Sequence, residues 1–301
     1  MFPFRTVTFS LSQAATVRSG PTEAWSLRFP PLPIWLFWEV ADVRGEELRS
    51  SVLGSEMMSK TDSVLYNQYF TNQSSHGRKP AELISSARWF DGEIIRRARI
   101  SSPDAAIVDL GCGFGRLLLA LKRAGYSNIR GVDLSPEQVG IAASLGLDNV
   151  ACDDVISYTR QLASASVDVV FALDLLEHLP KDALLELVGE VYRVLKPGGR
   201  FVVHVPNGEA IFSGRVLYGD LTHHRAFTQM SIRQLLSMHG LSDIACFEDR
   251  PIIHGPASLV RSVAWCFIRA CFAFIHAVES GPGSRILLSQ NFLATASKKV
   301  V

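Results

Sequence analysis

The stretch Ile107-Val-Asp-Leu-Gly-Cys-Gly-Phe-Gly-Arg116 decides the fold. The run before the glycines is short and mostly apolar, which predicts a buried strand, and residues 117–124 after them have the apolar spacing of a helix. Gly111, Gly113 and Gly115 let the backbone turn sharply and approach a ligand closely, while the helix start offers oriented N–H groups. A strand, a ligand-binding turn and a helix are therefore predicted here.

Short apolar runs alternate with helical stretches on both sides of this turn. Strands of this length that are apolar on both faces are typical of a parallel sheet covered by helices on each side. A doubly wound α/β fold is therefore predicted. The segments that carry this prediction are 80–99 as a packing helix, then 105–110, 117–124, 129–134, 136–145, 167–173, 181–195 and 199–205, with 241–248 and 286–296 as the last two strands.

The spacing of the glycines bears on the ligand. A dinucleotide-binding turn has the pattern GxGxxG, whereas this turn reads GxGxG and has Arg116 where the third glycine would pack. Asp133 ends the next predicted strand, 20 residues after Gly113, where a carboxylate can accept both hydroxyls of a ribose. The pattern argues against NAD and predicts another nucleoside-bearing cofactor.

Four motifs in order resemble the Rossmann-like, class I methyltransferases that use S-adenosylmethionine. They are Asp109-Leu-Gly-Cys-Gly-Phe-Gly115, Val132-Asp-Leu-Ser135, Val167-Asp-Val-Val-Phe-Ala-Leu-Asp-Leu-Leu-Glu-His-Leu-Pro180 and Leu195-Lys-Pro-Gly-Gly199. The resemblance covers about residues 105–207, and its Glu-His-Leu-Pro element is similar to that of ubiquinone-biosynthesis-type O-methyltransferases and their small-molecule relatives. It implies a mostly parallel, seven-stranded sheet with an antiparallel last strand.

The resemblance also implies which residues hold S-adenosylmethionine. Leu173 would contribute backbone near the sulfonium. The residues expected around the methionine moiety are Asp109, Gly111, Cys112, Gly113 and Gly115.

The nucleoside half is assigned in the same way. Asp133 would hold the ribose and Leu134 would lie against the adenine. Asp153 would face the adenine amino group, with Asp154 as the alternative because the usual glycine before the aspartate is missing. The competing interpretations are a solvated strand end for Asp133 and a helix N-cap for Asp153.

Lys196-Pro-Gly-Gly199 is interpreted as architecture rather than recognition. Proline is predicted to stop the preceding helix, and the two glycines are predicted to turn the chain into a strand over 201–205.

Gly219-Asp-Leu-Thr-His-His-Arg-Ala-Phe-Thr228 is the densest polar cluster in the chain. It resembles a segment of bacterial methyltransferases that act on sugars and related small molecules. His223 is the first candidate for a general base or acceptor-positioning group, because an imidazole titrates near neutral pH. Arg225 would hold an acidic substrate group, and Asp220 and His224 complete the predicted substrate-binding set.

Each acceptor-side assignment has a structural alternative. Thr228 is a suitable N-cap for a helix over 230–239, so the histidines of the cluster would then only organise that turn. His178, in the Glu-His-Leu-Pro element, either orients the acceptor as a second catalytic residue or caps a turn before Pro180.

Composition and charge exclude several functional classes. Thirty Lys and Arg against 29 Asp and Glu leave a net charge of +1 with no basic stripe, and Ala172-Leu-Asp-Leu175 stands where nucleic-acid amino methyltransferases often carry Asn-Pro-Pro-Tyr. Methylation of DNA or RNA is therefore disfavoured. The five cysteines form no CxxC pair, so no zinc site or disulfide framework is predicted, and a reducing, cytoplasmic compartment fits best. A sulfonium loses its methyl group readily, so no metal is predicted at the site.

The two ends of the chain differ from the middle. Residues 1–56 show no sustained periodicity and are predicted to be a poorly structured extension, which is interpreted as sequence upstream of the true start because Met57-Met58 follows. The alternative is a membrane-touching or partner-binding arm around Trp35 and Trp38. Residues 57–301 are predicted to form the methyltransferase domain.

Residues 257–279 run without a proline and are predicted to form an apolar helix inserted before the last strand. Arg269 in its middle argues against a membrane span. Two interpretations remain open: a helix lying in the interface of the inner membrane, or one packed on the domain or a dimer partner. The polar side chains that share one narrow face are Ser258, Arg261, Ser262, Trp265, Arg269, His276 and Glu279, with Phe272 among them.

Together these features predict an S-adenosylmethionine-dependent methyltransferase that methylates a hydroxyl of a small molecule or saccharide by direct displacement. Two alternatives from other classes are an NAD-dependent oxidoreductase and a regulatory protein that binds S-adenosylmethionine without turnover.

Overall fold

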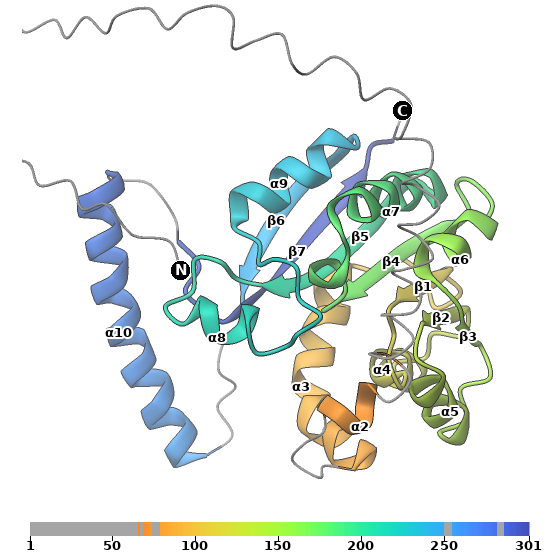
Figure 1. The fold of residues 1–301 in the computed structure, drawn as a ribbon, viewed down its shortest axis with the longest axis horizontal. Helices are drawn as coiled ribbons and strands as arrows, with labels where there is room; N and C mark the ends of the chain where they lie inside the picture. The colour runs from red at the N-terminus through yellow and green to blue at the C-terminus, as the bar shows by residue number, and fades with distance from the viewer. Residues whose placement is uncertain (1–65, 67–68, 74–78, 250–254, 282–285, 301) are drawn as a thin grey trace, which may run out of the picture. The chain divides into compact units, whose positions relative to one another are not determined.

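The computed structural model describes residues 66, 69–73, 79–249, 255–281 and 286–300. Its seven-stranded sheet has the order β3-β2-β1-β4-β5-β7-β6 (Figure 1). The strands are β1 (Ile107–Leu110), β2 (Ile129–Asp133), β3 (Val150–Cys152), β4 (Val167–Leu173), β5 (Leu195–Pro206), β6 (Leu241–Glu248) and β7 (Asn291–Lys298). The first five strands pair in parallel, and β7 is antiparallel to β5 and β6, which confirms the predicted sheet. The predicted extension at 1–56 lies outside the described residues.

Helices cover both faces of the sheet (Figure 1). One layer holds α3 (Pro80–Ala98), α4 (Arg116–Arg123) and α5 (Pro136–Ser144), and the other holds α6 (Val155–Gln161), α7 (Lys181–Val194) and α9 (Gln229–Met238). Consecutive strand residues serve the two layers in turn: Phe171 packs with α3 and α4, and Ala172 packs with α7. Each fully buried large apolar side chain contributes roughly 1.5–3 kcal/mol, so both layers fix the sheet.

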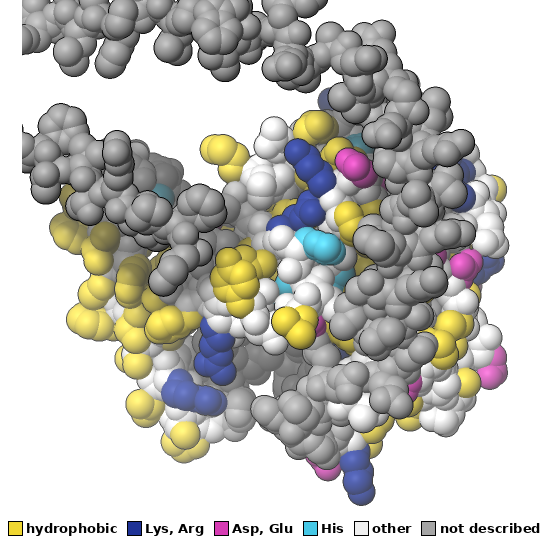
Figure 2. Space-filling view, in the orientation of Figure 1, with side chains coloured by type: hydrophobic (Ala, Val, Ile, Leu, Met, Phe, Trp, Pro, Cys, Tyr) yellow, Lys and Arg dark blue, Asp and Glu magenta, His cyan; other side chains and the backbone are white. Residues whose placement is uncertain are grey.

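Three further helices complete the described chain. They are α2 (Tyr69–Gln73), α8 (Ser213–Leu217) and α10 (Pro256–Ser280), with a 3₁₀ helix at Leu176–His178. The predicted helix 257–279 is thus confirmed as α10 (left in Figures 1 and 2), and hydrophobic side chains gather along it in Figure 2.

Two predicted strand boundaries were wrong. Lys196–Gly199 is not a separate turn, because β5 already begins at Leu195, which pairs with Val167, and the next paired residues are Val169 and Arg200. Four residues therefore bulge opposite Asp168, whose carboxylate accepts the Lys196 ammonium at 2.6 Å and anchors the bulge. The last strand starts at Asn291 rather than 286, since its antiparallel partner β5 ends at Pro206, opposite Asn291.

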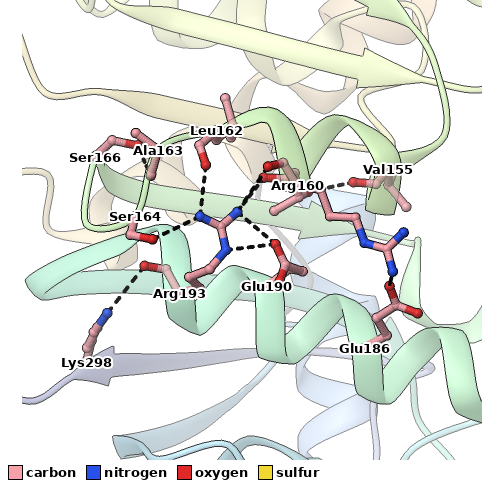
Figure 3. Close-up of polar contacts among 11 residues, drawn as sticks. Val155, Arg160, Leu162, Ala163, Ser164, Ser166, Glu186, Glu190, Arg193 and Lys298 are labelled. Carbon is pink, nitrogen blue, oxygen red and sulfur yellow. Dashed lines mark hydrogen bonds and ion pairs between the residues drawn. The ribbon is translucent and has the colours of Figure 1, made fainter.

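The junction of α6 and α7 depends on Arg193 (Figure 3). Its guanidinium donates to the carbonyl oxygens of Thr159 at 3.0 Å and Leu162 at 2.9 Å where α6 ends, and the Thr159 oxygen also accepts from Leu162 N at 3.1 Å. Glu190 Oε2 accepts from Nε at 2.9 Å and from Nη2 at 2.7 Å, so the guanidinium is held in place. Nearby Arg160 forms only an exposed ion pair with Glu186.

We expect Arg193→Met to lower the free energy of unfolding by about 2–3 kcal/mol, because several hydrogen bonds to a charged group are lost and the Leu162 carbonyl loses its donor. The matched variant Arg160→Met should cost less than about 1 kcal/mol, as exposed ion pairs contribute little. Urea unfolding of both variants checks this, and equal losses would contradict it.

Candidate functional site

A cavity of about 970 Å³ opens at the carboxyl ends of the parallel strands. This is the edge where open α/β sheets bind ligands. It brings together most of the residues predicted from sequence, namely Asp109, Gly111, Cys112, Gly113, Asp133, Leu134, Asp154, Leu173, His178, Asp220, His223 and His224. Gly115, Asp153 and Arg225 are not among its lining residues.

Glycine is required in the loop after β1 for two different reasons. Gly113 has φ +58°, and a Cβ there would lie 2.8 Å from Gln138 Oε1 beside the cavity. Gly115 has φ +80° and starts α4, and a Cβ there would overlap Leu147 Cδ1. Gly113 therefore keeps the loop open toward a ligand, whereas Gly115 serves helix packing.

The Asp133 carboxylate ties this loop to the end of β2. Its Oδ2 accepts from Gly113 N at 2.7 Å and its Oδ1 from Ser135 N at 2.9 Å. Burial raises the pKa of Asp133, and the two backbone N–H groups oppose that rise. Only 8% of the residue is exposed, so it is not a solvated strand end. Each oxygen keeps a lone pair, so the carboxylate can also accept hydroxyl groups.

Several acidic residues lie near the start of α4. Asp109 is buried, and burial raises its pKa to about 8, with the charge of Arg116 opposing the rise. Arg116 forms an ion pair with Asp91 of α3, and burial raises the pKa of Asp91 to about 6. The carboxyl groups of Asp91 and Asp109 thus stand near the Arg116 guanidinium, and the charge of Asp133 also acts on Asp109. This environment suits a ligand that carries positive charge.

Asp91 and Arg116 were missed as site residues from sequence. Asp91 lies on the buried face of α3 together with Ile84 and Ile94. It follows Ile84 by seven residues and precedes Ile94 by three, which is helical spacing. An aspartate at a core position of an otherwise apolar face is a detectable signal. Its partner Arg116 was considered only for the glycine that it replaces.

The structure separates the two neighbouring aspartates after β3. Asp154 caps α6, accepting from Ile156 N at 3.0 Å and Ser157 N at 2.9 Å, and it lines the cavity. Asp153 is outside the cavity, where its carboxylate accepts from Asp154 N and from Gln161 Nε2. The helix N-cap suggested for Asp153 is therefore Asp154.

A chain of hydrogen bonds fixes His178. Thr222 Oγ1 donates to Asp220 Oδ1 at 2.6 Å, and His178 Nδ1 lies 2.7 Å from the same Thr222 oxygen. A carboxylate only accepts, so the single Thr222 proton points to Asp220 and His178 Nδ1 must donate. Nε2 of His178 then carries a lone pair. Tyr69 supports Asp220 from the other side, donating to Oδ2 at 2.8 Å.

His178 is neutral near pH 7. Burial lowers the pKa of its imidazole to about 4, and the nearby His223 acts in the same direction. His178 therefore combines a fixed tautomer with an unprotonated ring nitrogen, which are the properties of a general base.

His223 is oriented in a similar way. Its Nδ1 lies 3.0 Å from the carbonyl oxygen of Val216, which only accepts, so Nδ1 carries a proton, and Nε2 is the ring nitrogen without a hydrogen-bond partner among the described residues. The rings of His223 and His178 stand edge to face with centroids 4.7 Å apart. Both imidazoles therefore stand in one part of the cavity, each held through Nδ1.

Glu177 lies beside these two histidines. It is buried, Oε2 has no hydrogen-bond partner, and burial raises its pKa well above the usual range. One ligand atom each from Glu177, His178 and His223 lie within 4.8 Å of one another, so these side chains are close enough to hold a metal ion together. His224 contributes through its backbone, with its N–H donating to Glu177 O at 2.8 Å.

A second buried histidine supports the floor of the cavity. His204 Nδ1 lies 2.6 Å from Asp174 Oδ1, and its Nε2 lies 2.8 Å from Asp249 Oδ2. Burial opposes the charge, but the two carboxylates raise the pKa of His204 to about 10. Asp174, which lines the cavity with φ +52°, is thereby held in place. His204 is a single histidine in the otherwise apolar run of β5, and this position could have indicated a buried polar network from sequence.

Comparison with known proteins identifies the domain. Residues 108–203 match a family model described as a methyltransferase domain. The chain is 33% identical over 114 residues to a ubiquinone biosynthesis O-methyltransferase of Xanthomonas campestris pv. campestris (strain B100), covering 36% of this chain and 46% of that protein. A protein of the same name from Xylella fastidiosa (strain M23) is 34% identical over 113 residues, covering 36% and 45%. The chain thus spans just under half the length of these curated relatives.

Solved structures share the fold. A SAM-dependent methyltransferase from Archaeoglobus fulgidus superposes with a TM-score of 0.58 at 22% identity, covering 76% of this chain and 100% of that one. A Haemonchus contortus phosphoethanolamine N-methyltransferase 2 in complex with S-adenosyl-L-methionine gives 0.52 at 17% identity, covering 79% and 60%. The domain match shows that residues 108–203 belong to a methyltransferase domain, and these likenesses show that its fold is that of class I, S-adenosylmethionine-dependent methyltransferases.

Proposed function

We propose that the protein methylates a hydroxyl group of a small molecule or saccharide, using S-adenosylmethionine bound in the 970 Å³ cavity. The observation that carries this proposal is the shared cavity, in which the glycine loop and Asp133 meet the unprotonated Nε2 of His178 and the imidazole of His223. The curated relatives are named as O-methyltransferases, which supports oxygen as the acceptor atom. The resemblance of residues 219–228 to sugar-modifying enzymes keeps saccharides within the proposal.

The cavity residues fit the cofactor by their chemistry. Asp133 would accept the ribose hydroxyls, the half-exposed Leu134 would lie against the adenine, and Asp154 suits the adenine amino group better than Asp153 does. Asp109, which lines the cavity, would favour the positively charged methionine end. Leu173 would contribute backbone near the sulfonium. When bound, the cofactor supplies a methyl group on a sulfonium, which is an electrophile.

The acceptor side supplies a base. Nε2 of His178 or of His223 would take the proton of the attacking hydroxyl, and the cavity walls would align that oxygen. Asp220 is engaged by Tyr69 and Thr222, so it acts as a positioning residue for His178 rather than as a substrate ligand. The role predicted for Arg225 lacks support, because Arg225 does not line the cavity.

A regulatory protein that binds the cofactor without turnover is the competing function. Incubation of the purified protein with isotopically labelled S-adenosylmethionine and separate pools of phenols and saccharides distinguishes the two. A mass shift of one methyl group in either pool supports the proposal, and binding of S-adenosylhomocysteine with no labelled product in any pool supports the regulator.

We expect Asp133→Ala to weaken binding of S-adenosylhomocysteine about 10- to 100-fold, because charge-assisted hydrogen bonds to the ribose and to the loop are lost. Asp153→Ala is the matched control and should leave the affinity unchanged. Calorimetric titration checks both variants. Unchanged affinity in Asp133→Ala would contradict the cofactor placement.

Replacing the base should slow turnover by about 100- to 10,000-fold without weakening cofactor binding. Substitutions His178→Ala and His223→Ala test the two candidates separately. His239→Ala is the control, because His239 does not line the cavity and its Nδ1 hydrogen-bonds to Leu235 O. If His178 is the base, kcat/KM should fall only as the pH drops through about 4, because its lowered pKa keeps the ring neutral above that value. Full turnover in both variants would remove histidine catalysis.

We also propose that α10 lies in the plane of a membrane interface. Part of its polar stripe faces the protein: Ser258 is buried, and Arg269 Nη1 lies 2.9 Å from Glu248 Oε2, whereas Arg261 and Glu279 are exposed. Apolar side chains gather along α10 in Figure 2, and at the helical repeat the exposed apolar positions cover more of its circumference than one partner helix would, which favours lipid over a second copy. The exposed apolar residues are Leu259, Val260, Val263, Phe267, Ile268, Phe272, Phe274, Ile275 and Val278.

Chain connectivity argues against a membrane span. Among the described helices, α10 is the one long and apolar enough to cross a membrane. Its 25 residues extend about 37 Å, yet the chain reaches the buried Leu287 only seven residues after Ser280, a reach of about 25 Å. Leu288 N donates to Glu248 Oε1 at 2.9 Å, so the chain returns to the end of the strand that it left. A return across roughly 30 Å of hydrocarbon is too far for this connection.

We expect Phe274→Asp to reduce co-sedimentation with phosphatidylglycerol vesicles about tenfold or more, because an aromatic side chain is lost from lipid and a charge is added. Met238→Asp adds the same charge at an exposed position of α9 and should bind like the wild type. Equal binding of the two variants, or a dimer that only Phe274→Asp abolishes, would contradict the lipid proposal.

A further inference from the structure

Four arginines surround a second cavity, of about 370 Å³, away from the methyltransferase site. Arg96, Arg97 and Arg99 come from the end of α3 and the residue after it, and Arg200 comes from β5. Arg200 pairs with Val169 near the start of β4, whereas Leu173 at the other end of β4 borders the first cavity. The two cavities therefore lie toward opposite edges of the parallel strands.

Positive charge exceeds negative charge around this second cavity. Arg96 and Arg97 share the carboxylate of Glu93, whose Oε1 lies 2.7 Å and 2.6 Å from their nitrogens. Asp243, the acidic residue of the lining, accepts from the Ser297 hydroxyl at 2.7 Å. Among the described residues, neither Arg99 nor Arg200 has an ion-pair partner within 4 Å. Four positive and two negative groups leave an excess of two charges.

Arg200 is the least satisfied of the four. Its Nε is buried without a hydrogen-bond partner, and Nη2 makes only a long contact of 3.5 Å with Thr295 Oγ1. Burial lowers the pKa of Arg200, and the charge of Arg99 acts in the same direction. An anion in the cavity would pair with the buried N–H and relieve this repulsion.

The end of α3 explains only part of this arrangement. Cations suit a helix C-terminus, which accounts for Arg96 and Arg97. Arg99, by contrast, holds a left-handed φ of +49°, which is unusual for a side chain other than glycine. The Arg97 guanidinium is oriented by the Phe247 ring, 3.8 Å from its centroid. The helix dipole gives no reason for Arg200 to approach from β5.

We propose that this arginine cavity binds a phosphoryl group. Guanidinium groups pair with phosphate oxygens through two parallel hydrogen bonds, and arginines converging from a helix end and a strand can reach different oxygens of one tetrahedral group. The excess of two positive charges matches a phosphate dianion. Two sources offer this chemistry, a phosphorylated small molecule and the headgroup of an anionic lipid.

Calorimetric titration of the full chain, loaded with S-adenosylhomocysteine, with inorganic pyrophosphate tests the small-molecule source. Sedimentation with phosphatidic acid vesicles, corrected for binding to phosphatidylcholine vesicles, tests the lipid source. We expect Arg200→Gln and Arg99→Gln each to weaken at least one of these interactions tenfold or more. Arg160→Gln, an exposed arginine of α6, is the control and should match the wild type.

Arg99→Gln guards against a folding defect, because Arg99 is exposed and its replacement should not disturb the core. Affinity for S-adenosylhomocysteine should stay unchanged in both test variants, which separates this site from the methyltransferase site. The proposal would be overturned if the wild type bound neither probe. It would also be overturned if Arg99→Gln and Arg200→Gln bound the probes as strongly as the control Arg160→Gln.

Discussion

The Asp133 carboxylate bridges two segments on which the site depends. By accepting from Gly113 N and Ser135 N, it joins the loop after β1 to the start of α5. Cys112 N adds a third link, donating to Val132 O at 3.0 Å. The loop is therefore held open before any ligand enters, and the same carboxylate remains available to the ligand. This arrangement joins loop structure and recognition in one side chain.

Two buried histidines near the cavity are held in opposite charge states by their surroundings. His204 lies directly between two carboxylates, which stabilise its charged form and hold Asp174 in place. His178 is linked to Asp220 through the Thr222 hydroxyl. This hydroxyl orients the imidazole, while the Asp220 carboxylate makes no direct hydrogen bond to the ring. Burial then dominates and leaves His178 neutral. One histidine is thus suited to structure and the other to accepting a proton.

The parallel sheet could be predicted from sequence because its strands are buried on both faces and read as unbroken apolar runs. The bulge at Lys196–Gly199 could not, since proline and glycine there are equally compatible with a turn between a helix and a strand. It exists because the Asp168 carboxylate accepts from both Lys196 Nζ and Ala106 N. Local propensity did not indicate these long-range bonds.

Sequence motifs predicted individual residues on both sides of the site, but not the contacts between distant ones. The glycine loop and Asp133 form a local pattern, and all but Gly115 of that set line the cavity. The orienting network was missed because its members are far apart: Tyr69 and Asp220 are separated by 151 positions and His178 and Thr222 by 44. Arg225 shows the reverse error, since membership of a polar cluster did not bring its side chain to the cavity.

The same limit applies to the two surfaces outside the cavity. Periodicity located the polar stripe of α10 but not the direction in which it faces, and an ordinary surface helix would have turned that stripe to water. The Arg269–Glu248 ion pair and the burial of Ser258 show the opposite orientation. Likewise, three arginines at a helix end need no ligand until Arg200 meets them from β5 with a buried, unpaired N–H. In both cases the chemistry follows from which side of an element faces the protein, and only the fold determines that.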